Sequence, residues 1–555
     1  MKESGGRTQE LRLAFLTGVA VLFVYLACAG GRIVASDEHT MFLLTQSLVE
    51  RHTVAVPEGN AEVGPDGRLY PKAGIGQALA AAPFYVLGKL AAPFAPPRLR
   101  PFVVRAGTSL VNPFAGGVLA AVFLLLLLEL GLAPRQALGL TAVAAFATPL
   151  WVYAKLFLGE TLLATGLTVE LYGVTRLRKD GGMGAAALAA LGFGFAILVK
   201  YAIAPAAVLF FLPALPELKR VRPALASILI VGASLAVALA YDVARTGNLI
   251  SSGYGRQGTL AAFSTPIWVG LYGLLFSSGK GLLWFAPVVA LAPAGFLAWR
   301  RIDSKLAMGV AAGVVVTILL YATFEHWAGD GSWGPRYLVP LVPALVAAVG
   351  ARLANRSLPD RRVWWGTVLG LGLLGAAVQV GGVAIYFGAQ MREAGDYPYT
   401  RALSDPRFMN ESHWNPYFTP IAGHWRMLAR NLREHLSGHV PHVSLSDASA
   451  ASAVAAPSDA TTSRIGVSEE QATALTHGFD LWPAYAVYAG LPAVIVLLAW
   501  ALVWLVALAY GSWALRQASW MTLRQGPSVR PAPPPEQDSG TTVRAGSLFS
   551  MTEPR

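Results

Sequence analysis

Two acidic residues follow the first long apolar run of the chain, in the stretch SDEHTMFLLTQSLVERH. Asp37 and Glu38 come a few residues after that run, where a membrane-spanning helix would leave the bilayer. A carboxylate there can accept a proton from a hydroxyl or an amine, and it can also bind a metal ion. The same stretch also suits a capped helix, with Ser36 as N-cap and an apolar face at Met41 and Leu44 resting on the membrane. The spacing alone leaves both interpretations open.

Two cationic residues fall in glycine-rich loops further along the chain. Lys280 lies in SSGKG and Arg336 lies in GSWGPRY, each beside an apolar run. Backbone N–H groups in a glycine-rich turn can bind an anion, and a guanidinium can hold a phosphate through two hydrogen bonds. Either side chain could instead reach the bilayer surface only to anchor its helix. Two loops of this kind beside a carboxylate favour a lipid-phosphate site.

Three further charged residues flank apolar runs, namely Lys155, Glu160 and Lys200. Glu160 could contribute to a metal or lipid site, although a glutamate that starts a helix is the simpler interpretation. The chain has no HExxH pattern or comparable spacing of metal ligands, so we predict no metal site and no cofactor.

The elements that must position these residues are membrane spans. Of the 555 residues, 55% are hydrophobic and 13% are charged, whereas an average soluble domain is about 25% charged. This composition excludes a disordered chain, a coiled coil and most soluble enzymes. The net charge of +12 is spread in short clusters between apolar runs, which is typical of charges that orient a membrane protein and not of a nucleic-acid groove. The single cysteine, Cys28, excludes disulfides within the chain and cysteine-based zinc sites.

We therefore predict an all-α polytopic membrane protein. A helical span needs roughly 20 mostly apolar residues. The predicted spans are 13–31, 107–130, 137–154, 161–175, 184–199, 201–216, 224–243, 282–299, 306–324, 337–354, 363–388 and 483–510, a bundle of about 12 transmembrane helices.

Segment 73–95 is apolar enough to be ambiguous, and the charge distribution decides how we place it. If it does not cross, nineteen basic residues fall on one side of the membrane: Lys2, Arg7, Arg12, Arg135, Arg176, Arg178, Lys179, Lys219, Arg220, Arg222, Arg300, Arg301, Lys305, Arg352, Arg356, Arg361, Arg362, Arg516 and Arg524. If it crosses, every later cluster faces outward, which the positive-inside rule disfavours. We predict that 73–95 is re-entrant or interfacial and that both termini are cytoplasmic.

This topology divides the chain into five regions. They are a cytoplasmic N-terminus (1–12), a transmembrane region (13–388) whose outer loop 32–105 carries interfacial helices, an outer loop (389–482), a last transmembrane helix (483–510) and a disordered cytoplasmic tail (511–555). Within the outer loop, GHWRMLARNLREHL at 423–436 predicts an amphipathic helix, and the Ser/Ala/Thr-rich stretch 444–475 predicts a flexible linker.

An Asp-Glu pair just after the first span, an apolar helix and then a basic-aromatic stretch resemble the polyprenyl-phosphate-sugar glycosyltransferases of the GT-C fold. Among these, the chain is most similar to protein O-mannosyltransferases and to the aminoarabinose transferases that modify lipid A. The resemblance implies that Asp37, the Asp of the pair, is the catalytic base, with Glu38 beside it. A later Lys-Pro-Pro-type segment of the family corresponds to GRLYPKAGIGQALAAAPFYVLG, so the resemblance implies that Lys72 faces the donor phosphate.

The resemblance implies a GT-C-like membrane glycosyltransferase, with its active site on the periplasmic or exterior face of a bacterial inner membrane. It would transfer a sugar from a polyprenyl-phosphate carrier to a lipid, glycan or protein acceptor by inverting displacement. Asp37 would deprotonate the acceptor, while Lys72, Lys280 and Arg336 would neutralise the departing phosphate. The expected partners are the lipid donor, the acceptor and membrane lipids, and no nucleic acid.

The alternative is a transporter or flippase for lipid-linked sugars. Transporters tend to place ionisable residues at mid-membrane on broken helices. Here the spans 13–31, 107–130 and 483–510 carry almost no charge at mid-depth, and the polar clusters lie outside the spans. This distribution favours the enzyme.

The predicted topology is testable by cysteine labelling. We expect a membrane-impermeant maleimide added from outside to label a cysteine placed at Ser458 and to spare one placed at Arg178. Opposite compartments for the two flanks of 73–95 would contradict the charge argument.

Overall fold

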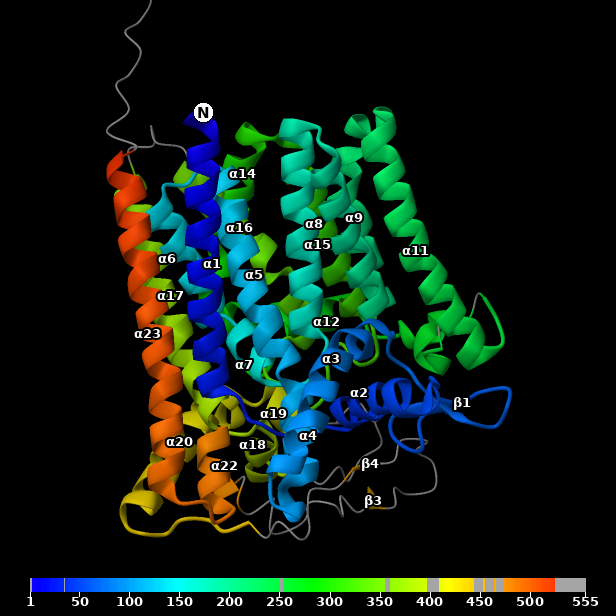
Figure 1. Ribbon diagram of the computed structural model, residues 1–555, viewed down its shortest axis with the longest axis vertical. Helices are drawn as coiled ribbons and strands as arrows, with labels where there is room; N and C mark the ends of the chain where they lie inside the picture. Colours follow the sequence, from blue (N-terminus) through cyan, green and yellow to red (C-terminus); the bar gives the residue numbers. More distant parts are fainter. Residues whose placement is uncertain are drawn as a thin grey trace, which may run out of the picture.

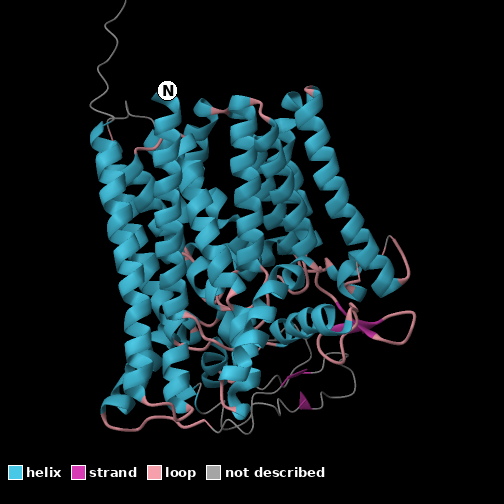
Figure 2. Ribbon diagram, viewed as in Figure 1, coloured by secondary structure: helices cyan, strands magenta, loops and turns pink. Residues whose placement is uncertain are grey.

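The computed structural model of the protein describes residues 2–33, 35–249, 251, 253–354, 360–396, 409–443, 453–454, 464–465, 474 and 476–524. Within these ranges the chain is almost entirely helical (Figure 2). The predicted linker 444–475 and the predicted tail from Gln525 lie largely or wholly outside the described residues. The strands are two short antiparallel pairs, β1 (Ala61–Val63) with β2 (Leu69–Pro71), and β3 (Ala453–Val454) with β4 (Arg464–Ile465).

Most of the helices form one bundle (Figure 1). Its helices are α1 (Lys2–Cys28), α5 (Val111–Glu129), α6 (Pro134–Phe146), α8 (Glu160–Asp180), α9 (Met183–Val199), α10 (Ala204–Phe211), α11 (Val221–Thr246), α14 (Ala292–Ile302), α15 (Ser304–Thr323), α16 (Val342–Ala354), α17 (Arg361–Ala384) and α23 (Ala493–Arg524). The shorter helices are α2 (Ser36–Gln46), α3 (Gly76–Ala91), α4 (Arg100–Ser109), α7 (Leu150–Lys155), α12 (Ile267–Phe276), α13 (Leu282–Phe285), α18 (Phe387–Glu393), α19 (Asn410–Trp414), α20 (Pro420–Leu436) and α22 (Trp482–Tyr488).

The fold confirms an all-α polytopic membrane protein. Within the described residues, eight helical segments are long and apolar enough to cross a bilayer, and all twelve predicted ranges overlap helices. Four of the predicted ranges overlap none of these eight segments, namely 137–154, 161–175, 184–199 and 282–299. The count of twelve therefore stays a prediction.

The start of α1 and the end of α23 lie at the same end of the bundle, at the top of Figure 1. Helices α2, α4, α20 and α22 gather at the opposite end. In segment 73–95, α3 pairs with α4 at that lower end, and Gly88 and Gly107 let the two helices approach so closely that a Cβ on Gly107 would lie 2.7 Å from the Gly88 Cα. This arrangement agrees with the prediction that the segment does not cross.

The prediction of interfacial helices in the first outer loop is wrong in detail for α2. Its apolar side chains Met41 and Leu44 are buried against the rest of the protein and do not form a free face. The apolar residues left exposed in this loop belong to α3 and the turn after it, including Leu87, Leu90 and Phe94. An apolar pattern has the same spacing whether it packs on lipid or on another helix, so the sequence could not distinguish these cases.

The predicted last span is also wrong in its bounds. Residues 483–510 are not one helix, because the chain breaks between α22 and α23, where Gly490 has a positive φ of 85° and Pro492 lacks an N–H for a continuing helix. The helix then runs to Arg524, so residues 511–524 of the predicted disordered tail are helical.

The amphipathic helix predicted at 423–436 is present as α20. It packs on the bundle through His424, Met427 and Asn431, which are buried. Its apolar side chains Trp425 and Leu436 are exposed, as an interfacial helix requires.

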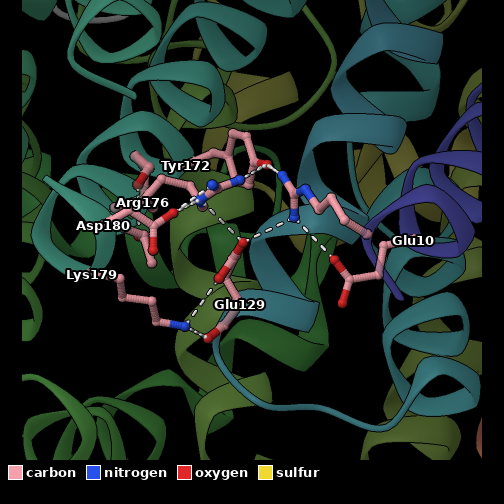
Figure 3. Close-up of polar contacts among 9 residues, drawn as sticks. Glu10, Glu129, Tyr172, Arg176, Lys179 and Asp180 are labelled. Atoms are coloured by element: carbon pink, nitrogen blue, oxygen red, sulfur yellow. Dashed lines mark hydrogen bonds and ion pairs between the residues drawn. The ribbon is translucent and has the colours of Figure 1, made fainter. Parts of the chain in front are cut away.

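At the end of the bundle that holds the N-terminus, one carboxylate joins three helices (Figure 3). The Glu129 carboxylate, at the end of α5, forms ion pairs with Arg7 of α1 at 3.1 Å and with Arg176 and Lys179 of α8 at 3.5 and 3.1 Å. Its side chain is 15% exposed. Because the three cations come from two different helices, Glu129 fixes how α1, α5 and α8 meet at this end.

We expect Glu129→Gln to lower the free energy of unfolding by about 1–3 kcal/mol, since it weakens hydrogen bonds from Arg7 and Lys179 and removes the ion pair with Arg176. The apparent melting temperature of the detergent-purified protein measures the effect. Glu10→Gln is the matched control, because Glu10 pairs only with Arg7 and is 33% exposed, so the change should cost less than about 1 kcal/mol. Equal melting temperatures for the two variants would show that Glu129 does not hold this junction.

Candidate active site

A single guanidinium joins three distant parts of the chain at the end of the bundle opposite to the N-terminus. The Nη1 of Arg336 donates to Asp37 Oδ2 at 2.9 Å, and its Nε donates to Glu160 Oε1 at 2.6 Å. Arg336 starts a 3₁₀ helix, η9 (Arg336–Leu341), Asp37 lies in the first turn of α2, and Glu160 is the first residue of α8. The two carboxylates therefore share one cation.

The two carboxylates differ in exposure, and that difference assigns them different roles. The Asp37 side chain is 37% exposed, whereas the Glu160 side chain is only 3% exposed. A reactant arriving from outside the bundle can therefore reach Asp37 but not Glu160. The buried Glu160 is suited to hold Arg336 in place.

Asp37 is held as an anion. Burial acts to raise the pKa of its carboxyl, but the charge of Arg336 and a 2.9 Å hydrogen bond from Asn60 Nδ2 outweigh burial, so the pKa lies below its ordinary value. Asn60 is itself fixed, because its backbone N–H donates to the Thr40 hydroxyl at 2.7 Å. Asp37 is thus ionised at neutral pH and oriented by groups on two sides.

Lys200 adds a second cation to the cluster. It follows α9, between two predicted spans, and its ammonium lies 4.3 Å from the centre of the Tyr337 ring, which stacks on Tyr321 at 4.3 Å. Burial lowers the pKa of Lys200 to about 8, and the charge of Glu160 limits the shift. Among the described residues Lys200 makes no hydrogen bond, and the second carboxylate oxygen of Glu160 is buried without a partner. The cluster therefore keeps unused hydrogen-bonding capacity beside Asp37.

Glu38 lies next to Asp37 but faces the protein interior. Its Oε1 accepts from the backbone N–H of Phe157 at 2.8 Å, and its Oε2 accepts from the backbone N–H of Ala35 at 3.0 Å. Glu38 therefore caps α2, whereas Ser36, the expected N-cap, is already the first helical residue. Because Phe157 shortly precedes Glu160, Glu38 also fixes the distance between α2 and the start of α8. The geometry is that of a positioning residue.

Lys280 holds the loop that precedes Arg336. Its side chain is fully buried, and its ammonium donates to the backbone oxygens of Asp330 at 2.8 Å and Ser332 at 2.6 Å and to the Ser332 hydroxyl at 3.2 Å. These bonds shape the loop that leads to Arg336. Burial lowers the pKa of Lys280 to about 7. The Lys280 ammonium is thus already hydrogen-bonded within the protein. Its direct contact with a donor phosphate stays a prediction.

Lys72 lies to the side of the cluster. Its ammonium forms an ion pair with Glu62 at 3.1 Å, and its side chain is 13% exposed. Arg245 donates to the carbonyls of Pro71 and Lys72 at 3.0 and 2.8 Å, which holds this segment in place. No contact between Lys72 and Asp37 is found among the described residues, so its role toward a donor phosphate also stays a prediction.

Lys155, the third flanking residue, belongs to a different buried cluster. Its ammonium donates to Val383 O at 2.7 Å and to Asp480 Oδ2 at 2.8 Å, and Asp480 also accepts from Arg32. This cluster attaches the segment before α22 to the ends of α1, α7 and α17. It positions the outer loops and does not join the Asp37 cluster.

Within the described residues, no group of three or more His, Cys, Asp or Glu side chains is placed as a metal site would require. The two carboxylates of the cluster hold a guanidinium between them. The predicted independence from metals and cofactors stays a prediction.

No family model and no curated protein matches the chain. Several solved structures are similar to it, among them two of ArnT. ArnT from Cupriavidus metallidurans bound to undecaprenyl phosphate is 14% identical with a TM-score of 0.45, covering 76% of this chain and 79% of that chain. ArnT from the same organism in the apo state is 15% identical with a TM-score of 0.43, covering 80% and 81%. At TM-scores this low the likeness decides neither the fold nor the reaction.

The shared guanidinium predicts how stability changes with pH. Arg336→Gln leaves the buried Glu160 without a cation, and we expect a loss of about 3–5 kcal/mol in the free energy of unfolding at neutral pH. In the wild type the pKa of Asp37 is depressed, so its stabilising contribution is present above about pH 4 and is lost as the pH falls through the depressed value. In the variant Asp37 loses the charge that lowers its pKa, so burial raises that pKa, and the folded state gains stability as the pH falls.

Between about pH 7 and pH 4 the melting temperature should therefore stay nearly constant for the wild type, falling only below about pH 4, whereas it should rise for Arg336→Gln as the pH falls over the same range. Arg256→Gln is the control, because Arg256 pairs with Glu325 at 3.2 Å but is 68% exposed. It should follow the wild-type trend. A variant of Arg336 that shows the same trend as the wild type would contradict the electrostatic coupling.

Proposed function

We propose that the protein is a GT-C-type membrane glycosyltransferase. It transfers a sugar from a polyprenyl-phosphate carrier to an envelope acceptor at the outer face of a bacterial inner membrane. The observation that carries this proposal is the cluster of Asp37, Arg336, Glu160 and Lys200, which places a reachable carboxylate beside two cations at one end of an apolar bundle. Such a site suits a reaction in which one reactant loses a proton and another departs as a phosphate.

The proposed reaction is a single displacement at the anomeric carbon of the sugar. An acceptor hydroxyl attacks that carbon, the bond from the carbon to the phosphate oxygen breaks, and the lipid phosphate leaves with the bonding electrons. Asp37 takes the proton of the hydroxyl. One displacement inverts the configuration at the anomeric carbon, so the product has the opposite anomeric form to the donor.

Arg336 and Lys200 stabilise the negative charge of the departing phosphate. Arg336 is fixed by Glu160 and so presents its charge without reorganisation, and Lys200 supplies an ammonium that makes no hydrogen bond among the described residues. As the phosphate departs its negative charge grows, which raises the proton affinity of the nearby Asp37 while Asp37 accepts the proton. The paired Arg336 thus keeps Asp37 ionised before the reaction without preventing it from acting as a base.

A transporter of lipid-linked sugars is the second candidate, and one residue favours it. Glu170 lies in the middle of α8, is fully buried, and neither of its carboxylate oxygens has a hydrogen-bond partner among the described residues. Ionisable residues buried at this depth are common on transport pathways. The experiment below separates the candidates, because a transporter would move a labelled lipid across proteoliposomes without transferring its sugar.

For the enzyme, we expect Asp37→Asn to reduce sugar transfer by about 10²–10⁴-fold, the usual contribution of a positioned base. Transfer of radiolabelled sugar from undecaprenyl-phosphate carriers to membrane acceptors in proteoliposomes measures this loss. Asparagine keeps the size of aspartate and can still accept hydrogen bonds from Arg336 and Asn60. If Asp37 is purely structural, the change should lower the melting temperature but leave the turnover of the folded protein near the wild-type value.

Two variants serve as controls. Glu38→Gln should do less harm than Asp37→Asn, because Glu38 is bonded to backbone N–H groups. Glu58→Gln alters an exposed carboxylate of the same loop and should transfer normally. Wild-type turnover by Asp37→Asn, with carrier binding unchanged, would remove Asp37 from the mechanism.

The pKa of Lys200 predicts that binding of the donor lipid weakens at alkaline pH. Its pKa of about 8 means that it is charged at neutral pH and loses its charge as the pH rises through about 8. Binding of undecaprenyl phosphate should weaken over that range. Lys200→Arg should remove this alkaline limb, because a guanidinium stays charged above pH 12. A wild-type affinity that is flat from about pH 7 to pH 9 would show that Lys200 does not contact the phosphate.

A further inference from the structure

Beside the Asp37 cluster lies a cavity of about 330 Å³, which we call the hairpin cavity. One wall is the β1–β2 hairpin with Glu62, Gly64 and Tyr70. The opposite wall is formed by Arg245 and Thr246 of α11 and by Ser251, Gly253 and Gly255 of the loop that follows. Its volume is at the lower end of the range for small-molecule pockets, roughly 300–1,000 Å³, which is room for one small head group.

Gly253 and Gly255 let one wall of the hairpin cavity pass close to the polar side chains Arg245 and Glu62. A Cβ on Gly255 would lie 2.6 Å from the Glu62 carboxylate, and a Cβ on Gly253 would lie 2.3 Å from the Arg245 guanidinium. Both glycines have positive φ, of 55° and 66°, which other residues rarely adopt. The loop can therefore pass this close to Glu62 and Arg245 only with glycine at these positions.

The charges of the hairpin cavity are neutralised in pairs. Arg245 is bonded to Asp242 through Nε at 2.9 Å and Nη2 at 2.6 Å, and Glu62 is paired with Lys72 at 3.1 Å. The Glu62 side chain is still 38% exposed, so its carboxylate can accept further hydrogen bonds. A neutral cavity with an acceptor carboxylate, the exposed Ser251 hydroxyl and a tyrosine ring suits a neutral group rich in hydroxyls and not an anion.

Two connections lead from the hairpin cavity to Asp37. Asn60, which donates to Asp37, directly precedes β1 and so continues the wall that carries Glu62. Tyr254 lies between the two glycines of the opposite wall, and its hydroxyl is buried without a hydrogen-bond partner among the described residues. Arg245 of the cavity wall and Asp37 and Arg336 of the cluster all act on this tyrosine electrostatically, so it is near both the cavity and the cluster.

We propose that the hairpin cavity is the acceptor subsite and that it binds one neutral saccharide unit, with the Glu62 carboxylate accepting hydrogen bonds from its hydroxyls. This inference rests on the proposed glycosyltransferase function. It assigns the acceptor to a carbohydrate-bearing molecule.

Saturation-transfer NMR on the full-length protein in nanodiscs tests the inference without any donor lipid. The neutral probe is methyl α-D-glucopyranoside, and glucose 6-phosphate is the charged comparison. We expect the neutral probe to give the stronger signal with the wild type. Glu62→Gln should bind it about tenfold more weakly, the effect of losing a hydrogen bond to a charged acceptor.

Two tryptophan variants separate filling of the cavity from a general disturbance. Ser251→Trp places a large side chain in the cavity and should abolish the signal, whereas Ser264→Trp, at an exposed position of the same outer loop outside the lining, should leave it unchanged. Undecaprenyl phosphate should bind all variants equally. No saccharide signal above that of empty nanodiscs, an undiminished signal in Ser251→Trp, or stronger binding of glucose 6-phosphate would overturn the inference.

These outcomes are distinguishable from failure of the proposed function. Saccharide binding without any sugar transfer from polyprenyl-phosphate carriers would overturn the enzyme assignment and leave the cavity as a carbohydrate site. Normal transfer by Ser251→Trp would overturn the subsite and leave the enzyme.

Discussion

The ion pairs of Arg336 with Asp37 and Glu160 connect parts of the chain that are far apart in sequence. In a protein whose interior excludes water, the charge of a carboxylate is costly to bury unless a cation lies against it, as Arg336 lies against Glu160. That requirement fixes the start of α8, the first turn of α2 and the entry to α16 relative to each other. The remaining outer structure can be understood as the means by which this contact is kept in register.

Several buried groups hold the surrounding backbone and leave the cluster free for chemistry. Lys280 binds the carbonyls of the loop that precedes Arg336, and Glu38 binds the N–H groups of the loop that precedes Glu160. Arg245 does the same for the segment around Lys72. Each uses a full charge to satisfy backbone groups where loops lack regular hydrogen bonds, because unpaired backbone groups are costly in this environment.

The sequence predicted the fold class, since apolar length and charge distribution are local properties. It also singled out Asp37 and Arg336, which the structure brings into contact, while their catalytic roles stay predictions. It could not predict that Arg336 pairs with Glu160, because nothing local relates two residues 176 positions apart. It could not show that Lys280 binds backbone carbonyls, because a lysine in a glycine-rich turn has the same sequence pattern whether it binds a ligand or its own carbonyls. The contact of Lys280 with a phosphate stays a prediction. The start of the last span was missed because the apolar residues continue across the break at Gly490.

Because Asp37 is exposed and Glu160 is buried, the proposed reaction would also determine how the product leaves the site. Before reaction the charges of Asp37, Glu160, Arg336 and Lys200 cancel. With a proton on Asp37 the same four groups carry one net positive charge, which holds a departing phosphate. The exposed Asp37 can return that proton directly to solvent, and the cluster then loses its positive charge while the phosphate product is still present. Proton release would therefore weaken product binding, so that the enzyme expels the spent carrier as it regains its base.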